Sequence, residues 1–205
     1  AKMTATKPPA TGLALMRGEI FAAYKFSRAT SATASVSKGL KTDADPATFA
    51  LYDMPEEIKQ RFSKDIGHDE RVAIHVRRGD YLQTDFYVNL WETGYYQKAL
   101  EHFKDEKFLI FCADRQNVEQ DKLDREWCYW FFRGLLPNGN FTMHIPSPDE
   151  ADDLNAMAAC KGIIGANSSF SWWACYLGNG VKIMPKNWHS DGVERTVCPS
   201  DWIRI

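Results

Sequence analysis

No apolar stretch in this chain approaches the roughly 20 residues that a helix needs to span a bilayer. The longest such run, residues 108–113, has the length of a strand. We therefore expect no membrane anchor within these 205 residues, and any membrane attachment would need a segment outside them.

An excess of positive charge is also missing, since 25 Lys and Arg face 27 Asp and Glu for a net charge of −2. This balance gives no electrostatic reason to expect a nucleic-acid partner. The five cysteines are an odd number, without a C-x-x-C pair or a spacing that suits zinc. We expect most of them to be small buried hydrophobic residues rather than members of a disulfide scaffold.

Four common catalytic motifs are absent: G-x-G-x-x-G, G-x-x-x-x-G-K-[ST], H-E-x-x-H and G-x-S-x-G. Their absence argues against a dinucleotide oxidoreductase, a P-loop NTPase, a zincin and an α/β-hydrolase. The ends of the predicted strands also carry no D-x-D pair that would clamp a metal ion. Arginine would then have to neutralise any diphosphate leaving group, so the sequence predicts no metal site.

Composition divides the chain into two parts. Residues 1–42 hold seven Lys or Arg against a single Glu, and residues 28–37 are a low-complexity run of mostly Ala, Ser and Thr. We interpret residues 1–52 as a basic low-complexity extension or a truncated N-terminal domain. The main domain is predicted over residues 53–205, and it opens with a capping box and a helix at residues 53–65.

From residue 71 onward, short apolar runs alternate with helical patterns. Strands are predicted at residues 72–76, 107–113, 141–145, 162–166 and 181–184, and helices at residues 92–105, 118–132, 147–160 and 169–177. This alternation predicts an α/β fold with a doubly wound, Rossmann-like parallel sheet that is complete within residues 71–184.

Open parallel sheets bind ligands beyond the carboxyl ends of their strands. The first strand runs into His75, Arg77, Arg78, Gly79 and Asp80. Two arginines at a glycine turn can present a planar, permanently charged fork to a diphosphate. A solvated salt-bridge surface is the alternative.

The fourth strand runs into Asn167, Ser168 and Ser169 at the start of a helix. These residues are either ordinary N-caps or an anion site at a helix N-terminus. Trp172 and Trp173 follow, and we expect at least one of them to pack in the core rather than stack on a sugar or base.

Aspartates follow two other strands, at Asp114 and at Asp152 with Asp153. Such residues are caps or solvated side chains, or, beside a nucleotide, acceptors for a guanine edge or ribose hydroxyls. The sequence leaves these alternatives open.

Together these segments resemble the α-1,2-fucosyltransferases, a group whose signature is H-x-R-R-G-D-Y. The matching segments are residues 72–82 (VAIHVRRGDYL), 95–99 (YYQKA), 108–114 (FLIFCAD), 153–177 and 181–205. The resemblance implies the C-terminal GDP-sugar-binding domain of a GT-B glycosyltransferase. It also implies inverting transfer of L-fucose from GDP-β-L-fucose to the 2-hydroxyl of a terminal galactose in a β-galactoside glycan acceptor, without a metal or other cofactor.

The resemblance also assigns roles to residues. Arg77 would bind the β-phosphate and stabilise the departing GDP. Arg78, Ser168 and Ser169 would hold the nucleotide or its phosphates, and Asp153 would bind guanine.

His75 would support the arginine loop and belongs, with Asp114 and Asn167, to the predicted donor-binding group. Gly79 and Asp80 would form a structural turn. Asp85, just beyond this turn, is the candidate for the general base that an inverting displacement needs.

The family's glycine-rich opening motif, G-G-L-G-N-Q-[ML]-F-Q-Y, has no counterpart in this sequence. A non-catalytic GDP- or GDP-sugar-binding domain is therefore the alternative function. We expect a cytoplasmic location, as for bacterial members of the family, and the Golgi lumen, as for animal members, is the alternative.

Overall fold

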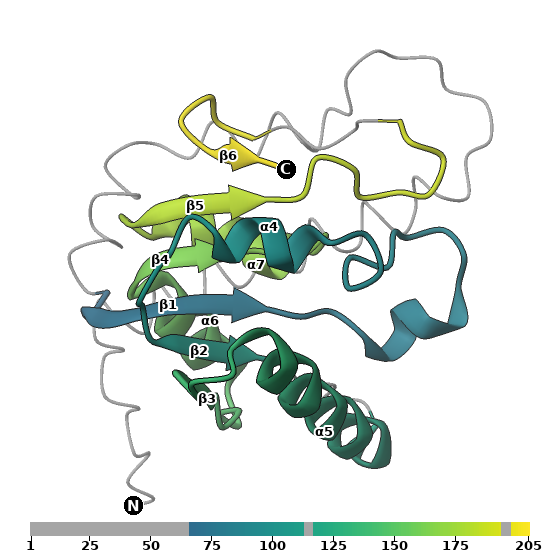
Figure 1. Cartoon of the computed structure of the whole chain (residues 1–205), viewed down its shortest axis with the longest axis horizontal. Helices are drawn as coiled ribbons and strands as arrows, with labels where there is room; N and C mark the ends of the chain where they lie inside the picture. Colours follow the sequence, from purple (N-terminus) through teal and green to yellow (C-terminus); the bar gives the residue numbers. More distant parts are fainter. Residues whose placement is uncertain (1–65, 113–116, 194–197) are drawn as a thin grey trace, which may run out of the picture. The chain divides into compact units, whose positions relative to one another are not determined.

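The computed structural model describes residues 66–112, 117–193 and 198–205 (Figure 1). The helix predicted at residues 53–65, the boundary predicted after residue 52, and Asp114 lie outside the described residues.

A six-stranded sheet forms the centre of the described part, and all of its strands are parallel. The strands are β1 (Asp69–His75), β2 (Phe108–Phe111), β3 (Phe141–Met143), β4 (Cys160–Ile164), β5 (Val181–Met184) and β6 (Ile203–Arg204). Their order across the sheet is β3-β2-β1-β4-β5-β6, the Rossmann order. The predicted α/β class and parallel sheet are confirmed.

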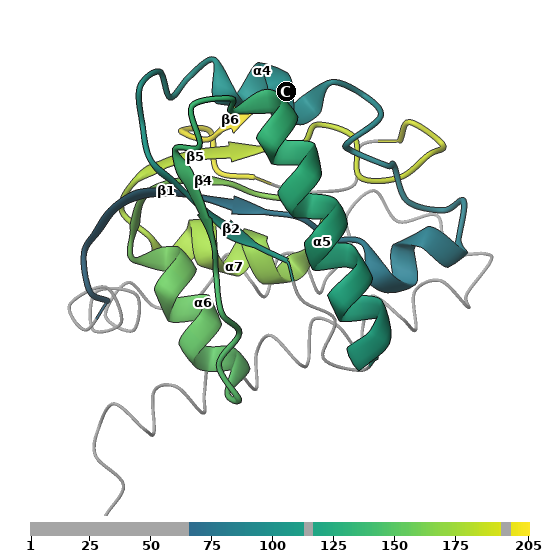
Figure 2. The ribbon, with the colours of Figure 1, turned by 60° about the horizontal axis from the view of Figure 1, so that its bottom comes forward.

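In the described part of the chain, four α-helices cover the two faces of the sheet: α4 (Tyr95–Leu100), α5 (Val118–Leu135), α6 (Glu150–Ala158) and α7 (Ser169–Leu177). Helices α4 and α5 lie on one face, and α6 and α7 lie on the other (Figures 1 and 2). On the α4 and α5 face, Tyr96 and Phe132 pack with Val72 and Ile74 of β1 in the hydrophobic core. Burial on both faces explains why the strands read as continuous apolar runs rather than as alternating patterns.

Two predictions need correction, one about the extent of the sheet and one about the length of a helix. The sheet is not complete within residues 71–184, because β6 pairs with β5 through Ile183 and Ile203. A strand of two residues is too short to produce a recognisable apolar run. The helix predicted at residues 92–105 is shortened to α4, since Gly94 adopts a left-handed conformation (φ 74°) immediately before it.

Two helix ends also differ from prediction. Helix α5 continues through Gly134 to Leu135 instead of ending at residue 132. Helix α6 begins at Glu150 rather than at Ser147, because Asp149 is the N-cap and accepts a hydrogen bond from the backbone N–H of Ala151 at 2.9 Å.

The cysteines and tryptophans behave largely as the sequence predicts. All five cysteines are free; Cys198 is half-buried and the other four are buried. Trp172 and Trp173 are both buried, so neither presents an open face to a ligand. Among the helices of the described residues, none is both long and apolar enough to cross a membrane.

Candidate active site at the carboxyl edge of the sheet

The loops after β1 and β4 meet where the strand order reverses. β1 and β4 are neighbours in the sheet, but their following connections lead to opposite sides, which is the position where open α/β sheets bind ligands. The hydroxyl of Tyr81 donates a hydrogen bond to the backbone oxygen of Asn167 at 2.9 Å. The ring of His75 lies 5.6 Å from the ring of Phe170. The fold thus brings together two predicted segments about 90 residues apart in sequence.

Arg77 presents its guanidinium at this junction. Its side chain is 29% exposed, and Nη2 donates to Oδ1 of Asp80 at 2.6 Å. The guanidinium also lies 5.3 Å from the centre of the Tyr81 ring. Asp80 therefore contacts Arg77 within the arginine loop, and its role as a structural turn residue stays a prediction. Because the Asp80 carboxylate is largely exposed, this ion pair contributes little to stability.

His75 places a buried nitrogen at the same junction. The residue is 7% exposed, and among the described residues Nδ1 has no hydrogen-bond partner. Burial, with a smaller contribution from the Arg77 charge, lowers the pKa of His75 to about 3. The imidazole is thus neutral near pH 7. A buried polar atom without a partner is the kind of atom that a bound ligand can satisfy.

The N-terminus of α7 supplies the second half of the junction. Ser168 is the N-cap, and its hydroxyl accepts a hydrogen bond from the backbone N–H of Phe170 at 3.3 Å. Ser169 follows as the first helical residue and is half-buried. The N–H groups and the partial positive charge of a helix N-terminus favour an anion. Both interpretations of this segment, N-cap and anion site, are therefore compatible.

Asn167 anchors neighbouring loops. Its buried side-chain amide donates to the backbone oxygens of Val88 at 2.9 Å and Trp188 at 3.1 Å. These bonds join the loops that follow β1, β4 and β5. The predicted contact between Asn167 and the nucleotide-sugar donor stays a prediction. In the structure the amide nitrogen donates to the two backbone oxygens.

Arg78 points to α5 instead of lying beside Arg77. Its Nε donates to Oδ1 of Asp124 at 2.9 Å, and its side chain is 12% exposed. The backbone N–H of Gly79 donates to Oδ2 of the same carboxylate at 2.8 Å. The predicted contact of Arg78 with the nucleotide stays a prediction.

The sequence interpretation missed Asp124. A signal was present, because Asp124 precedes the buried Cys128 and Phe132 by four and eight residues. This spacing places a charged residue within the apolar stripe of a helix, where an acid needs a partner.

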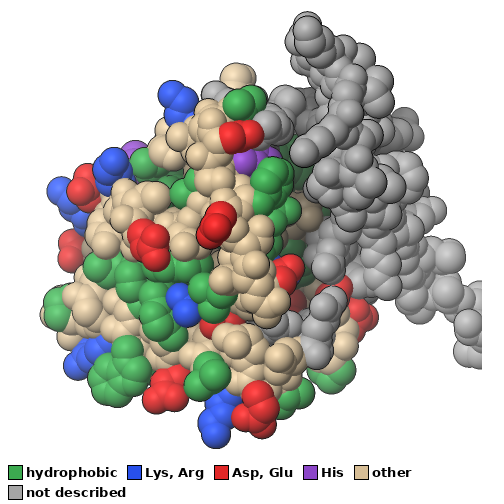
Figure 3. Space-filling view, turned by 90° about the vertical axis from the view of Figure 1, so that its right-hand side faces the viewer, with side chains coloured by type: hydrophobic (Ala, Val, Ile, Leu, Met, Phe, Trp, Pro, Cys, Tyr) green, Lys and Arg blue, Asp and Glu red, His purple; other side chains and the backbone are tan. Residues whose placement is uncertain are grey.

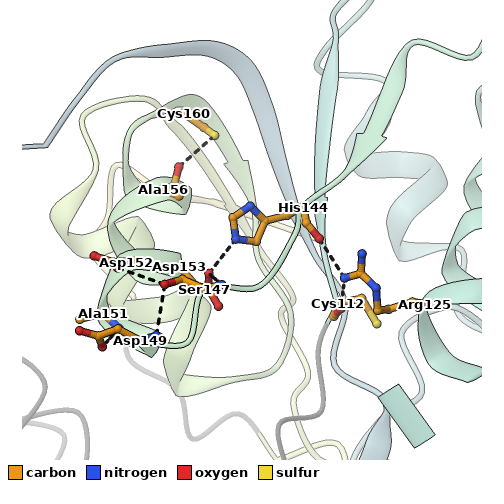
Figure 4. A network of polar contacts seen from close by, with 10 residues as sticks. All are labelled: Cys112, Arg125, His144, Ser147, Asp149, Ala151, Asp152, Asp153, Ala156 and Cys160. Carbon is orange, nitrogen blue, oxygen red and sulfur yellow. Dashed lines mark hydrogen bonds and ion pairs between the residues drawn. The ribbon is translucent and has the colours of Figure 1, made fainter. Parts of the chain in front are cut away.

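Asp153 lies in a polar network at the carboxyl end of β3 (Figure 4). Its Oδ1 accepts hydrogen bonds from Nε2 of His144 at 2.7 Å and from the backbone N–H of Ser147 at 2.8 Å. The backbone oxygen of His144 in turn accepts from Nη1 of Arg125 at 2.8 Å. His144, a second residue that sequence interpretation missed, therefore orients the aspartate that is predicted to bind guanine.

Asp85 lies on an exposed part of the loop between β1 and α4. Its backbone oxygen accepts a hydrogen bond from the hydroxyl of Ser190 at 2.5 Å, which joins this loop to the one after β5. The contact holds the Asp85 backbone at the carboxyl edge, and the role of its carboxylate as general base stays a prediction.

The face at the carboxyl edge carries charges of both signs between hydrophobic side chains (Figure 3). Within residues 66–112, 117–193 and 198–205, no three His, Cys, Asp or Glu side chains gather in a way that could hold a metal ion. Among the residues that the structure describes, Arg77 and the N-terminus of α7 offer positive charge to an anion at the strand junction.

These features define a Rossmann-like α/β protein with a candidate anion site at its topological switch point. Within this class, the chain belongs to glycosyl transferase family 11, whose family model matches residues 42–205. The predicted relationship to the α-1,2-fucosyltransferase family is confirmed, and with it membership of a glycosyltransferase family.

Individual relatives come from bacteria and mammals. An α-1,2-colitosyltransferase of Escherichia coli is 29% identical over 144 residues, which cover 65% of this chain and 47% of the relative. The O-antigen biosynthesis glycosyltransferase WbnK of Escherichia coli is 25% identical over 142 residues, with coverage of 65% and 44%. The galactoside α-(1,2)-fucosyltransferase 2 of Mus musculus is 25% identical over 151 residues, with coverage of 68% and 41%.

The matched region thus spans less than half the length of each of these relatives. No solved structure matches this chain.

Proposed function

We propose that this protein transfers L-fucose from GDP-β-L-fucose to the 2-hydroxyl of a terminal galactose, with inversion at the sugar. In this proposal the described domain is the C-terminal, donor-binding domain of a GT-B glycosyltransferase. The supporting observation is that the loop carrying Arg77 contacts the start of α7 at the switch point of a family 11 sheet, through Tyr81 and Asn167 and through His75 and Phe170. The α-1,2 linkage in the names of the colitosyl and fucosyl relatives supports the position of transfer.

The proposed step breaks the bond between C1 of fucose and the β-phosphate oxygen. The acceptor 2-hydroxyl oxygen forms the new bond from the opposite face, its proton goes to a general base, and GDP leaves with the bonding electrons. Arg77 would stabilise the negative charge that develops on the β-phosphate, because a preorganised guanidinium is most effective where charge appears in the transition state. Asp85 is the proposed base.

The remaining groups would hold the donor. Ser168 and Ser169 begin α7, where backbone N–H groups favour a phosphate. The neutral His75 offers Nδ1, which has no hydrogen-bond partner in the described part of the chain, and Asp153 offers an oriented carboxylate for the guanine edge. Since Arg77 and the helix N-terminus supply the positive charge, we propose that transfer needs no metal ion.

We place the reaction in the cytoplasm, with the Golgi lumen as the alternative. Fractionation of the native cells would distinguish the two locations.

The first test is calorimetric titration of the full chain with GDP and UDP, together with a transfer assay that uses GDP-fucose and lactose. We expect GDP to bind and UDP to bind far more weakly. Arg77→Ala should weaken GDP binding about ten- to hundredfold, as expected for loss of a charge-assisted hydrogen bond, and should abolish transfer. Arg77→Lys, the matched control, keeps the charge without the fork and should give an intermediate affinity.

Near wild-type transfer by Arg77→Ala would refute the assigned role, and preferential binding of a UDP sugar would refute the assigned nucleotide. A donor series that includes GDP-colitose tests the sugar, since a colitosyltransferase is among the relatives.

A second candidate function is a non-catalytic GDP- or GDP-sugar-binding domain. It stays open because the match covers less than half of each relative described above. GDP binding without turnover on any acceptor would favour this candidate.

A further inference from the structure

Asp124 buries a carboxylate on the inner face of α5. The residue is 2% exposed and shares this face with Cys128 and Phe132. Removing a charged group from water is unfavourable unless the group is paired and hydrogen-bonded. The buried carboxylate of Asp124 is therefore stable only because it is paired and hydrogen-bonded.

Both oxygens of this carboxylate accept hydrogen bonds. Oδ1 accepts from Nε of Arg78 at 2.9 Å and from Nε2 of Gln120 at 3.0 Å. Oδ2 accepts from the backbone N–H of Gly79 at 2.8 Å. Two of these three donors belong to the turn after β1, so one carboxylate binds consecutive residues of that turn and cannot rotate without losing one of them.

Aromatic rings hold the guanidinium of Arg78 as well. It lies 3.8 Å from the centre of the Trp127 ring and 4.8 Å from the centre of the Trp91 ring. Trp127 is three residues after Asp124, so α5 supplies both the carboxylate and the nearer indole. Cation–π contact and charge pairing thus act together on the same side chain.

This attachment determines where Arg77 lies. Gly79 takes a left-handed conformation (φ 49°) as the chain turns into the short helix η1 (Gly79–Gln83). Each residue has only two soft backbone dihedrals, so fixing Arg78 and Gly79 leaves Arg77 little freedom to move relative to β1. The Arg77 guanidinium stays partly exposed and is therefore accessible to a ligand.

We propose that Asp124 is a positioning residue for the donor diphosphate. By holding Arg78 and Gly79 from α5, it keeps the Arg77 guanidinium where the diphosphate binds. This inference rests on the proposed function, in which Arg77 contacts that diphosphate. Stability alone is a poor explanation for the buried pair, because well-packed apolar residues often replace such pairs without loss.

The test is a double-mutant cycle on GDP affinity, measured by calorimetry on the full chain. Asp124→Asn keeps the shape but loses the charge and one acceptor, so it should weaken GDP binding about tenfold. In the Arg77→Ala background the same change should alter affinity by less than about twofold, because the residue through which it acts is gone. Glu126→Gln, which removes an exposed charge from the same helix, should bind GDP like the wild type.

Wild-type affinity in Asp124→Asn would overturn the inference. So would a tenfold loss that persists in the Arg77→Ala background, since Asp124 would then act independently of Arg77. If Arg77→Ala binds GDP like the wild type, the proposed function itself fails, and the inference fails with it.

Circular dichroism shows whether each variant folds. If Asp124→Asn does not fold, Trp127→Phe provides the milder change. It should weaken GDP binding about threefold, as expected for a partly lost cation–π contact, and only while Arg77 is present. Unchanged affinity in Trp127→Phe would then overturn the inference.

Discussion

The buried His75 makes the stability of this protein depend on pH. In the folded chain, burial and the nearby Arg77 charge lower the pKa of His75 from 6.5 to about 3. The unfolded chain takes up a proton at this residue below about pH 6.5, whereas the folded chain does not until the pH approaches 3. Unfolding is thus coupled to proton uptake between these two values, and acid favours the unfolded state.

The size of the effect follows from the same two pKa values. Each pH unit in this window lowers the free energy of unfolding by about 1.4 kcal/mol. The His75 contribution is therefore fully present above about pH 6.5 and declines as the pH falls towards 3. Between pH 7 and pH 5, integration over the titration predicts a loss of about 2 kcal/mol from this residue alone.

Urea unfolding followed by tryptophan fluorescence measures this loss. In His75→Gln the decrease in the free energy of unfolding between pH 7 and pH 5 should be about 2 kcal/mol smaller than in the wild type. His102→Gln, which removes an exposed histidine, should keep the wild-type dependence. An equal decrease in the wild type and His75→Gln would show that His75 titrates in the folded chain as it does in water.

Three further outcomes test the packing and the chemistry. Gly134→Ala should raise the free energy of unfolding by about 0.5–1 kcal/mol in urea titrations, because the added Cβ would meet no described atom within 4 Å apart from its chain neighbours and the nearby helix backbone, and alanine favours the α5 helix. Gly180→Ala should lower it by about 1–3 kcal/mol, since its Cβ would lie 2.1 Å from the backbone oxygen of Lys161; an unchanged stability would refute this close approach. Fucose transfer should keep its rate in excess EDTA, and a loss that Mg²⁺ or Mn²⁺ restores would contradict the proposed metal-free reaction.

Much of the sheet could be predicted from local sequence. The apolar runs at Val72, Phe108 and Ile163 became buried parallel strands because burial on both faces requires such runs. The last strand could not be predicted, since Ile203 and Arg204 form a strand only by pairing with β5. The N-terminal limit of α4 likewise depends on the left-handed conformation of Gly94.

The candidate site shows a similar division. Arg77 and Ser168 could be selected because they follow strands that the pattern identifies, and His75 because it lies at the end of one, since the carboxyl ends of parallel strands share one edge. The direction of each side chain could not be read from this pattern. Adjacent arginines leave the same strand, yet one pairs with Asp80 at the exposed edge and the other with the buried Asp124.

By itself, the sequence determined the α/β class, the order of strands and helices, and the family, since periodicity and contiguous motifs are local properties of the chain. Only the tertiary structure decided that β1 adjoins β4, that Asn167 joins three loops, and that α5 carries the partner of Arg78. The three hydrogen bonds among these contacts join residues 21 to 79 positions apart, and they depend on packing that no local pattern records. The physical reason is that a buried charge or amide must find its partner wherever the fold brings one within reach.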